Sequence, residues 1–422
     1  MQRPGRQKIA LITPSLAKGG IEKVVVFSAK ELEKDYDVTV IVMDTFRTDY
    51  PYEGRVMDLG LSWEDRRLFP RVMNFIKAIV RLRKVKNEAQ FNMVIGHGEL
   101  ASFPNILSGG ENNIVVVHEN RFAAKKDLQG KIVNTLLGVL FKAKNVSHII
   151  TVSEGIRQSF IERFGMNKTQ VATIHNPYDI QTLKRLSKES LETPYQALFD
   201  QPVIVAAGRL IEAKGQWYLL RIFAVLKQKD PHVKLVILGE PASGSDLGER
   251  LIVLSRNLGL RTYSVWEENI FDETYDVYFM GFHQNPFKYM AASRLFAMTS
   301  VWEGFGNTIV EAMACGTPVI SSDCPSGPGE IIAPKLKQQG RTAQRAEEAY
   351  GMLMPPFENR FADTDEPLSE TEKLWAETLY ELLHDEARLK RLSEKGLQRA
   401  DDFRTEAIMQ EWNVLIDGVL RS

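Results

Sequence analysis

Short apolar runs alternate with helix-length segments along most of the chain. In the first half these runs cover residues 8–14, 37–44, 93–98, 114–119, 148–153 and 171–177. In the second half they cover residues 203–209, 233–240, 276–282, 295–300 and 318–323, and helical patterns dominate after residue 367. β-rich runs separated by helices predict βαβ units around parallel sheets that are buried on both faces.

The pattern is interrupted by a polar stretch at residues 187–202, which contains Pro194 and Pro202. We interpret this stretch as a linker between two similar α/β halves, each doubly wound. The predicted domains are residues 1–190 and 200–400, and residues 401–422 are predicted to form a helix that returns to the first domain. Ligands of such folds bind beyond the carboxyl ends of the strands, so we expect an active site in a cleft between the two sheets.

Composition narrows the class of protein. The 422 residues are 44% hydrophobic and 25% charged, which is typical of a globular enzyme with two or three domains. No apolar run of the sequence approaches the roughly 20 residues that a membrane span needs. The two cysteines, Cys315 and Cys324, come without a histidine-rich cluster, which predicts neither a disulfide framework nor a zinc site. We therefore expect a cytoplasmic protein.

The net charge of −1 hides an asymmetry. Residues 1–195 carry 29 Lys and Arg against 21 Asp and Glu, whereas residues 196–422 carry 24 against 33. Two domains with different partners would explain this difference, and drift in surface composition is the alternative.

Within the basic half, residues 66–86 have a basic amphipathic pattern. The apolar positions that can share one helical face are Phe69, Met73, Ile76, Ile79 and Val80. The cations around them are Arg71, Lys77, Arg81 and Lys84. Such a helix suits an anionic membrane surface, and a domain helix with a solvated basic face is the alternative.

Two places in the first half offer candidate ligand groups after a strand. Gly19 and Gly20 precede an amphipathic segment, where bare backbone N–H groups suit a phosphate at a helix N-terminus. An ordinary tight turn explains them equally well. His118 lies near the carboxyl end of the run at 114–119, where an imidazole is well placed to touch a substrate, although a lone histidine is more often structural.

The sequence GHGELA, at residues 96–101, raises a different function. Its spacing matches a dinucleotide fingerprint, and Glu119 follows about 20 residues later. However, the run before it is not the first of its domain, and Pro104 weakens the prediction of a following helix. An NAD-dependent oxidoreductase is therefore an alternative function, and otherwise His97 would be a polar group facing the cleft.

The second half carries a denser set of motifs. AAGRLIEAKGQW places Arg209 at a strand end and Lys214 near the next helix, an arrangement that would bind a diphosphate; a solvated pair of charges is the alternative. EGFGNTIVEAMACG spaces Glu303 and Glu311 by eight positions, about 2.2 helical turns. Glu303 would lie before the predicted helix 307–315 and Glu311 within it, so both carboxylates can accept hydrogen bonds from the hydroxyls of one ligand. The alternative for Glu311 is a surface glutamate on an amphipathic helix.

These motifs resemble glycosyltransferase family 4, whose members are retaining enzymes of GT-B fold. The resemblance rests on the E-x7-E block in EGFGNTIVEAMACGTPVI, on SSDCPSGPGEII after it, and on AAGRL…KG, MGFHQNP and the GG-x-E of residues 19–22, all in the family's order. It covers residues 8–335 and is weaker in the first half. It implies two Rossmann-like doubly wound domains facing across a cleft, the first binding the acceptor and the second the nucleotide-sugar donor.

The resemblance also implies roles for single residues. Glu303 would hold hydroxyls of the transferred sugar, and Glu311 would hold the ribose hydroxyls. Arg209 and Lys214 would neutralise the leaving diphosphate, and His118 would lie near the sugar's 6-position. The catalytic candidates are thus His118, Arg209, Lys214 and Glu303. The donor-binding set shares Arg209, Lys214 and Glu303 and adds Gly19, Gly20, Gly304, Phe305, Gly306, Asn307, Thr308 and Glu311.

The implied reaction moves a hexose or N-acetylhexosamine from a nucleotide diphosphate sugar, expected to be UDP-linked, to a glycan or polyprenyl-diphosphate-linked acceptor. It would serve lipopolysaccharide or polysaccharide assembly at the inner face of the cell membrane. No nucleic acid partner is expected. No DxD motif ends a strand, so no cofactor is required and a divalent cation would be non-essential. A non-catalytic nucleotide-sugar-binding subunit is a further alternative.

Overall fold

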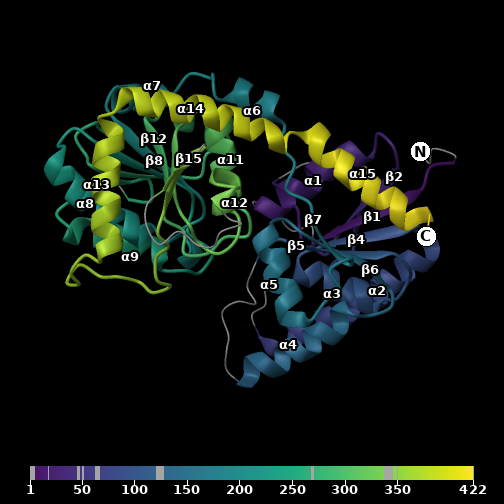
Figure 1. The fold of residues 1–422 in the computed structure, drawn as a ribbon. Coiled ribbons are helices and arrows are strands. Elements are labelled where there is room, and N and C mark those ends of the chain that lie inside the picture. The colour runs from purple at the N-terminus through teal and green to yellow at the C-terminus, as the bar shows by residue number, and fades with distance from the viewer. Residues whose placement is uncertain are drawn as a thin grey trace. The chain divides into compact units, whose positions relative to one another are not determined.

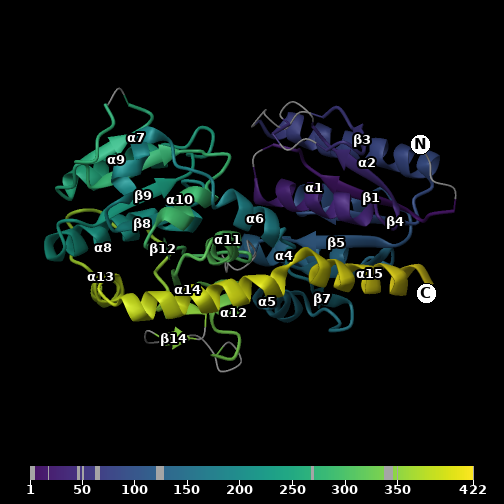
Figure 2. The same ribbon diagram turned by 90° about the horizontal axis from the view of Figure 1, so that it is seen from above.

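The computed structural model describes residues 5–17, 19–44, 48–49, 52–61, 67–119, 128–267, 270–336, 346–348 and 350–421. The chain divides into two compact units. Unit 1 contains residues 1–178 and 405–422, and unit 2 contains residues 179–404. Each unit is built on a sheet whose strands alternate with helices (Figures 1 and 2).

Unit 1 follows the alternation that the apolar runs predict. Its elements are β1 (Lys8–Thr13), α1 (Gly20–Leu32), β2 (Asp37–Val42), β3 (Arg55–Asp58), α2 (Leu68–Ala89), β4 (Met93–His97), α3 (Glu99–Leu107), β5 (Asn113–Val117), α4 (Leu128–Phe141), β6 (Val146–Thr151), α5 (Glu154–Phe164), β7 (Val171–Thr173) and α15 (Thr405–Arg421). The described strands pair in parallel in the order β3-β2-β1-β4-β5-β6-β7.

Helices cover both faces of this sheet, which explains the continuous apolar runs. On one face α2 and α3 pack against β1, β2 and β4 through Ala78, Leu82 and Ala101. α1 lies against β1 and β2 with side chains outside that cluster, and α15 packs beside α1. β3 was not predicted, because its four residues alternate between half-buried and exposed at the sheet edge.

Unit 2 repeats the architecture. Its elements are α6 (Ile180–Leu186), α7 (Thr193–Phe199), β8 (Val203–Ala207), the 3-10 turn η2 (Glu212–Lys214), α8 (Gln216–Lys229), β9 (Lys234–Leu238), α9 (Leu247–Asn257), β10 (Thr262–Ser264), β11 (Val277–Gly281), α10 (Phe287–Ala292), β12 (Leu295–Met298), α11 (Asn307–Ala314), β13 (Val319–Ser322), α12 (Pro328–Ile332), β14 (Ala346–Glu348), β15 (Gly351–Met354), α13 (Glu370–Leu383), α14 (Glu386–Ala400) and η4 (Asp401–Phe403). The described strands run in the order β10-β11-β9-β8-β12-β13-β15-β14, and the β14–β15 pair is antiparallel.

The core of unit 2 joins these strands to helices from both ends of its sequence. Trp217 on α8 and Trp375 on α13 are almost fully buried in one apolar cluster. Arg221 on α8 is buried as well, and its guanidinium forms an ion pair of 2.6 Å with Glu372 on α13. The late helices are therefore part of the second domain's interior.

The stretch interpreted as a linker is structured and belongs to unit 2. Residues 193–199 form α7, with Pro194 in the first turn, where a missing N–H costs no hydrogen bond. Glu192 accepts hydrogen bonds from Lys288 and from the Tyr289 hydroxyl at 2.7 and 2.6 Å, which ties this stretch to α10. The chain passes from unit 1 to unit 2 after Tyr178 rather than at residues 187–202.

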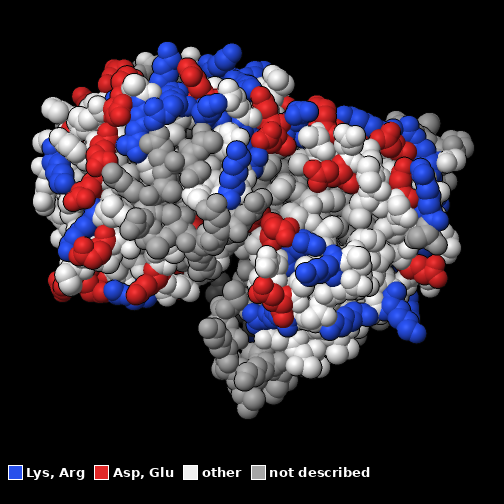
Figure 3. Space-filling model, viewed as in Figure 1, with Lys and Arg blue, Asp and Glu red and all other residues white. Residues whose placement is uncertain are grey.

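The C-terminal helix α15 belongs to unit 1. The Tyr36 hydroxyl donates to Asp417 at 3.2 Å, and both N–H and hydroxyl of Thr405 donate to the carbonyl of Tyr178 at 3.0 Å. α14, before it, remains in unit 2 and is basic (Figure 3). The excess of acidic residues in the second half is therefore not spread evenly over its surface.

Candidate active site

Lys214 and Glu303 meet at the carboxyl edge of the unit 2 sheet. Lys214 follows β8 on the turn η2, and Glu303 follows β12, the neighbour of β8. The ammonium Nζ of Lys214 lies 2.5 Å from Oε1 of Glu303. The Glu303 residue is 9% exposed, so this charge-assisted contact is shielded from bulk water.

The two oxygens of the Glu303 carboxylate have different surroundings. Oε1 also accepts a hydrogen bond of 2.6 Å from the hydroxyl of Ser300. The backbone carbonyl of Ser300 in turn accepts from the Ser322 hydroxyl on β13 at 2.5 Å. Within the described residues Oε2 has no hydrogen-bond partner and is not sealed from solvent. One oxygen is thus fixed, and the other is available to a ligand.

Two glycines allow the turn after β8 to approach β12. Gly215 has a φ of +56°, and a Cβ at this position would lie 2.5 Å from the carbonyl oxygen of Thr299. The Thr299 hydroxyl donates to the Gly215 carbonyl at 3.1 Å. Gly208 has a φ of +145°, and its position would place a Cβ 3.2 Å from Cε of Lys214. The Lys214 side chain therefore packs against the backbone of Gly208, where a larger residue would obstruct its contact with Glu303.

Arg209 differs from Lys214 in its surroundings. It is exposed at the end of β8, and within the described residues its guanidinium has no hydrogen-bond or ion-pair partner. Its backbone carbonyl accepts from the Gln216 side chain at 3.1 Å, which fixes the turn that carries it. The predicted pair of cations thus consists of one paired, half-buried ammonium and one exposed guanidinium.

The loop after Glu303 leads into α11 as predicted. Gly306 precedes the helix with a φ of +98°, a conformation that favours glycine. Phe305 is buried, and its ring packs edge-on against Phe403, so only its backbone can face a ligand. Thr308 directs its hydroxyl to the sulfur of Met298 at 3.8 Å.

The remaining donor-site candidates of this loop are Gly304, Asn307 and Glu311. Gly304 is buried, and Asn307 is half-buried at the start of α11. Glu311 is 9% exposed, which contradicts the alternative of a surface glutamate.

The nearby turn at residues 326–330 has a structural explanation. Ser326 and Gly327 both have positive φ, and a Cβ on Gly327 would overlap the carbonyl oxygen of Phe305. Glu330 accepts from the Gly327 N–H at 3.4 Å and caps α12. Cys324 is buried beside Glu303, and burial raises the pKa of its thiol far above the ordinary value. This cysteine is therefore not a nucleophile.

His118 lies at the carboxyl edge of the unit 1 sheet, directly after β5. Its Nε2 lies 3.0 Å from Nδ1 of His97, the last residue of β4, and the two rings are stacked. Burial lowers the pKa of His118 to about 4 and the pKa of His97 well below its ordinary value. Both imidazoles are therefore neutral near pH 7. The sequence had offered them as separate polar groups, and the contact between them comes from the parallel pairing of β4 and β5.

The glycine pair of unit 1 begins α1 as predicted. Gly19 precedes the helix with an extended φ of −176°, which any residue can adopt, and Gly20 is the first helical residue. The carboxylate of Glu22 folds back over Gly19. Its Oε2 lies so close that a Cβ on Gly19 would be only 2.1 Å away from it. A diphosphate at this helix start would therefore meet Glu22.

The GHGELA motif lies in the strand-to-helix context of a dinucleotide site, because α3 forms despite Pro104. Proline removes the N–H that would bond to the carbonyl of Leu100, and Leu100 is exposed to water. The first glycine has a packing role. A Cβ on Gly96 would lie 2.9 Å from Cα of Ser102, and the Ser102 hydroxyl donates to the Gly96 carbonyl at 2.9 Å.

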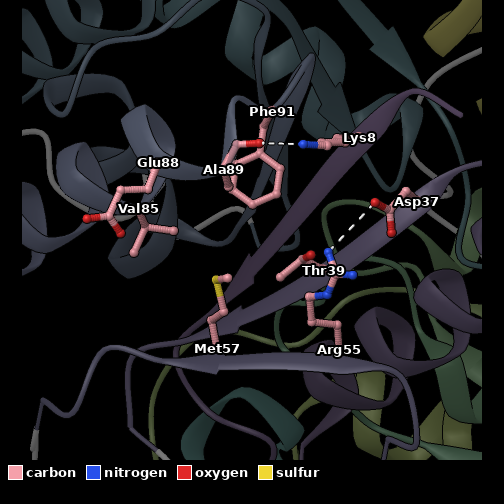
Figure 4. Close-up of a pocket in the computed structure, with 9 residues that line it drawn as sticks. All are labelled: Lys8, Asp37, Thr39, Arg55, Met57, Val85, Glu88, Ala89 and Phe91. Carbon is pink, nitrogen blue, oxygen red and sulfur yellow. Dashed lines mark hydrogen bonds and ion pairs between the residues drawn. The ribbon is translucent and has the colours of Figure 1, made fainter. Parts of the chain in front are cut away.

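A cavity of about 270 Å³ lies at the opposite, amino edge of the unit 1 sheet (Figure 4). Its walls include Lys8, Asp37 and Arg55, the first residues of β1, β2 and β3. Lys8 donates to the Ala89 carbonyl at 3.0 Å, and Arg55 lies 3.7 Å from Asp37. Lys8 is thus engaged with the backbone of α2 and Arg55 with Asp37, and none of the predicted site residues lines the cavity.

Two features are absent from the described part of the chain. Among its residues no group of three or more His, Cys, Asp or Glu is placed to hold a metal ion. No helix within it is long and apolar enough to span a membrane. The carboxylates of unit 2 can accept hydrogen bonds from sugar hydroxyls, and its two cations, Arg209 and Lys214, can pair with a phosphate.

Two doubly wound units with such a site define the class of GT-B glycosyltransferases. The chain matches the family model "Glycosyltransferase Family 4" over residues 18–182 and the model "Glycosyl transferases group 1" over residues 201–352. An uncharacterised glycosyltransferase of Methanocaldococcus jannaschii is 33% identical over 360 residues, which cover 82% of this chain and 84% of that protein. The protein therefore belongs to the group 1, family 4 glycosyltransferases and is an enzyme of that class.

Two further proteins are similar to the chain over most of its length. The N-acetylgalactosamine-N,N'-diacetylbacillosaminyl-diphospho-undecaprenol 4-alpha-N-acetylgalactosaminyltransferase of Campylobacter jejuni is 26% identical over 336 residues, 77% of this chain and 83% of that one. The structure of Anabaena HepE in complex with UDP and glucose superposes with a TM-score of 0.69 at 19% identity, covering 98% of this chain and 100% of that chain. The second likeness establishes the shared fold.

Proposed function

We propose that this protein transfers a hexose or N-acetylhexosamine from a UDP-sugar to a polyprenyl-diphosphate-linked glycan, with retention of the anomeric configuration. The observation that carries the proposal is the Glu303 carboxylate, whose Oε1 is held by Lys214 and Ser300 while Oε2 stays accessible. A fixed carboxylate with one open oxygen suits a sugar hydroxyl, which donates a hydrogen bond to it.

The leaving group in this proposal is UDP. Arg209 is exposed at the strand end and has no partner within the described residues, so it can pair with a diphosphate without first breaking a contact. The N-terminus of α11 adds backbone N–H groups behind Gly306. Charge stabilisation of this kind is worth about 3 kcal/mol for one well-placed donor. The C. jejuni relative is named for a diphospho-undecaprenol acceptor, which supports the same acceptor class here.

The proposed transfer proceeds on one face of the sugar. The bond from the anomeric carbon to the diphosphate breaks, the acceptor oxygen attacks from the same side, and its proton passes to the departing diphosphate oxygen. Arg209 and Lys214 stabilise the charge that develops on the diphosphate, and Glu303 orients the sugar. The two neutral histidines of unit 1 cannot serve as cations at pH 7 in this scheme. We expect no cofactor, and a divalent cation would be non-essential.

A lipid-linked acceptor calls for a membrane-facing surface, and α2 of unit 1 supplies the candidate. The large apolar side chains that α2 exposes are Phe69, Val72, Met73, Ile76 and Val80. At about 100° per residue these positions fall on one stripe of the helix. Lys77, Arg83 and Lys84 flank the stripe and are exposed. We propose that this stripe lies on an anionic membrane surface, and we place the enzyme at the inner face of the cell membrane.

Two of the cations predicted for the basic face, Arg71 and Arg81, do not flank the exposed stripe. Arg81 donates to the carbonyls of Leu59 and Gly60, so it has a role inside the unit. Arg71 falls on the other side of the helix from the stripe by the same 3.6-residue period. Arg83, which the sequence interpretation did not include, replaces them.

A panel of ligands tests the proposed donor. Thermal unfolding should be measured with UDP-, GDP- and ADP-sugars and with NAD. A ligand present at 100 times its Kd stabilises a protein by about 2.7 kcal/mol, so the true donor should raise Tm clearly. We expect UDP-sugars to do so and to yield free UDP with a polyprenyl-diphosphate glycan, and NMR of the product should show the donor's anomer. Stabilisation by NAD alone, or an inverted product, would contradict the proposal.

A further inference from the structure

The His97–His118 pair poses a question about protons. A neutral imidazole has one N–H and one bare nitrogen, so only one of the two rings can donate across the 3.0 Å contact. Either Nδ1 of His97 donates to Nε2 of His118, or the reverse holds. In the first arrangement Nε2 of His97 is bare and Nδ1 of His118 carries a proton. In the second arrangement Nε2 of His97 carries a proton and Nδ1 of His118 is bare.

Burial distinguishes the two arrangements. His97 is 2% exposed, and its Nε2 is sealed from solvent without a hydrogen-bond partner among the described residues. If His118 were the donor, this sealed Nε2 would carry a proton that bonds to nothing. Orphaned buried N–H groups are rarer in proteins than under-used acceptors, because a buried donor loses its bond to water outright. The sealed nitrogen of His97 should therefore be the bare one.

The open nitrogen of the pair is Nδ1 of His118. Within the described residues it has no hydrogen-bond partner, yet it is not among the sealed polar atoms. It belongs to a residue that directly follows β5 at the carboxyl edge of the sheet, where ligands of doubly wound folds bind. Gly98, next to His97, would place a Cβ 3.8 Å from Ile21 on the first turn of α1, so the pair lies beside the start of that helix.

We propose that His97 is a positioning residue that donates from Nδ1 to Nε2 of His118 and thereby fixes His118 as a neutral donor through Nδ1–H. His118 then offers a hydrogen bond to an oxygen of the bound substrate, and it does not act as a base. The rings are held in register by the parallel pairing of His97 with Val116 and by the N–H of Gly98, which donates to the Val116 carbonyl at 2.9 Å. The identity of the substrate oxygen rests on the proposed function, whereas the tautomer does not.

The tautomer can be observed directly. Long-range ¹H–¹⁵N spectra of protein labelled at its seven histidines distinguish a protonated ring nitrogen from a bare one, and His118→Ala assigns the signals. We expect Nδ1 of His118 to carry the proton in the wild type. A proton on Nε2 of His118 would overturn the proposal.

Two substitutions at His97 separate positioning from packing. In His97→Asn the amide nitrogen can donate from about the place of Nδ1, whereas His97→Leu has similar bulk and no donor. We expect His97→Asn to keep the His118 tautomer and turnover within about twofold. His97→Leu should mix the tautomers and lower kcat about tenfold, the value of one hydrogen bond. Equal loss in both variants, with the His118 signals unchanged, would assign His97 a packing role and reject the proposal.

Ser102→Ala is the matched control, because its hydroxyl donates to the backbone carbonyl of Gly96, next to His97 in the strand, and not to an imidazole. It should leave the His118 signals unchanged. If no sugar nucleotide is turned over by the wild type, the proposed function fails, and the spectrum still decides the tautomer.

Discussion

Nζ of Lys214 and Oε1 of Glu303 lie 2.5 Å apart although 89 positions separate the two residues in the chain. They meet because β8 and β12 are neighbours in the sheet and because Gly215 lets the turn after β8 contact the backbone of Thr299. The contact holds one carboxylate oxygen and leaves the second accessible.

Removing the Ser300 hydroxyl should weaken catalysis without weakening nucleotide binding. Ser300→Ala takes away the second donor to Oε1 of Glu303, and a hydrogen bond to a charged group contributes about 1.5–3 kcal/mol. We expect kcat to fall at least about tenfold while the Kd for UDP is unchanged. Ser321→Ala is the control, because its buried hydroxyl donates to the Ser322 carbonyl instead. Equal effects of the two substitutions would show that Ser300 does not position Glu303.

Arg209→Ala and Lys214→Ala should each lower turnover about 10²-fold, because in the proposed mechanism both cations stabilise the charge that develops on the diphosphate. Their effects on stability should differ. Arg209 is exposed and unpaired within the described residues, so its loss should leave Tm unchanged. Loss of Lys214 leaves the buried carboxylate of Glu303 without its counter-ion, which should cost about 1–3 kcal/mol. Chemical unfolding measures this difference, with the exposed Lys395→Ala as control. Near-normal turnover of both variants would contradict their proposed role.

Glu303 and Glu311 should contribute to different steps. We expect Glu311→Ala to weaken UDP binding, because a carboxylate that holds the ribose is engaged in the ground and transition states alike. Glu303→Ala should instead lower kcat, because the proposed ligand of Glu303 is the transferred sugar. Titration calorimetry with UDP, which lacks the sugar, separates the two roles. The division is wrong if both variants lose the same affinity for UDP.

The exposed stripe of α2 should bind anionic vesicles. Each Lys or Arg near such a surface contributes about 1 kcal/mol, so the triple replacement of Lys77, Arg83 and Lys84 by Gln should release the protein into the supernatant. Added salt should have the same effect, since the Debye length is about 8 Å at physiological ionic strength. Arg71→Gln, on the other side of the helix, is the control. Wild-type protein that stays in the supernatant at low salt would identify α2 as an ordinary domain helix.

His118 should make stability depend on pH. Its pKa is lowered to about 4 in the folded protein by burial, and the unfolded imidazole has an ordinary value of about 6.5. Between these values the unfolded chain binds the proton more readily, so the stability conferred by the neutral ring is present above pH 6.5 and is lost as pH falls toward 4. Urea unfolding of wild type and His118→Leu at pH 7 and 4.5 should show that the variant loses about 2 kcal/mol less. Parallel losses in both proteins would mean that His118 is not buried in its neutral form.

Those features that depend on local pattern could be read from the sequence. The apolar runs encode burial on both faces, and this is enough to predict the principal strands and the doubly wound class. The E-x7-E spacing predicts α11 with Glu303 before it and Glu311 within it, because helix geometry fixes neighbours within a few turns. The short strands β3, β10, β14 and β15 were missed, because three or four residues carry too little periodicity.

The tertiary structure decided which of these elements touch. Strand order in the sheet, which no local pattern encodes, brings Lys214 to Glu303 across β8 and β12 and His97 to His118 across β4 and β5. Tertiary contacts also place the polar stretch before β8 in unit 2, because Glu192 bonds to Lys288 and Tyr289 on α10, nearly a hundred positions later. Composition records that a residue is polar, whereas a hydrogen-bond partner exists only once the chain has folded. The sequence therefore determined the class and the candidate residues, and the fold determined which oxygen of Glu303 is held and which nitrogen of His118 is open.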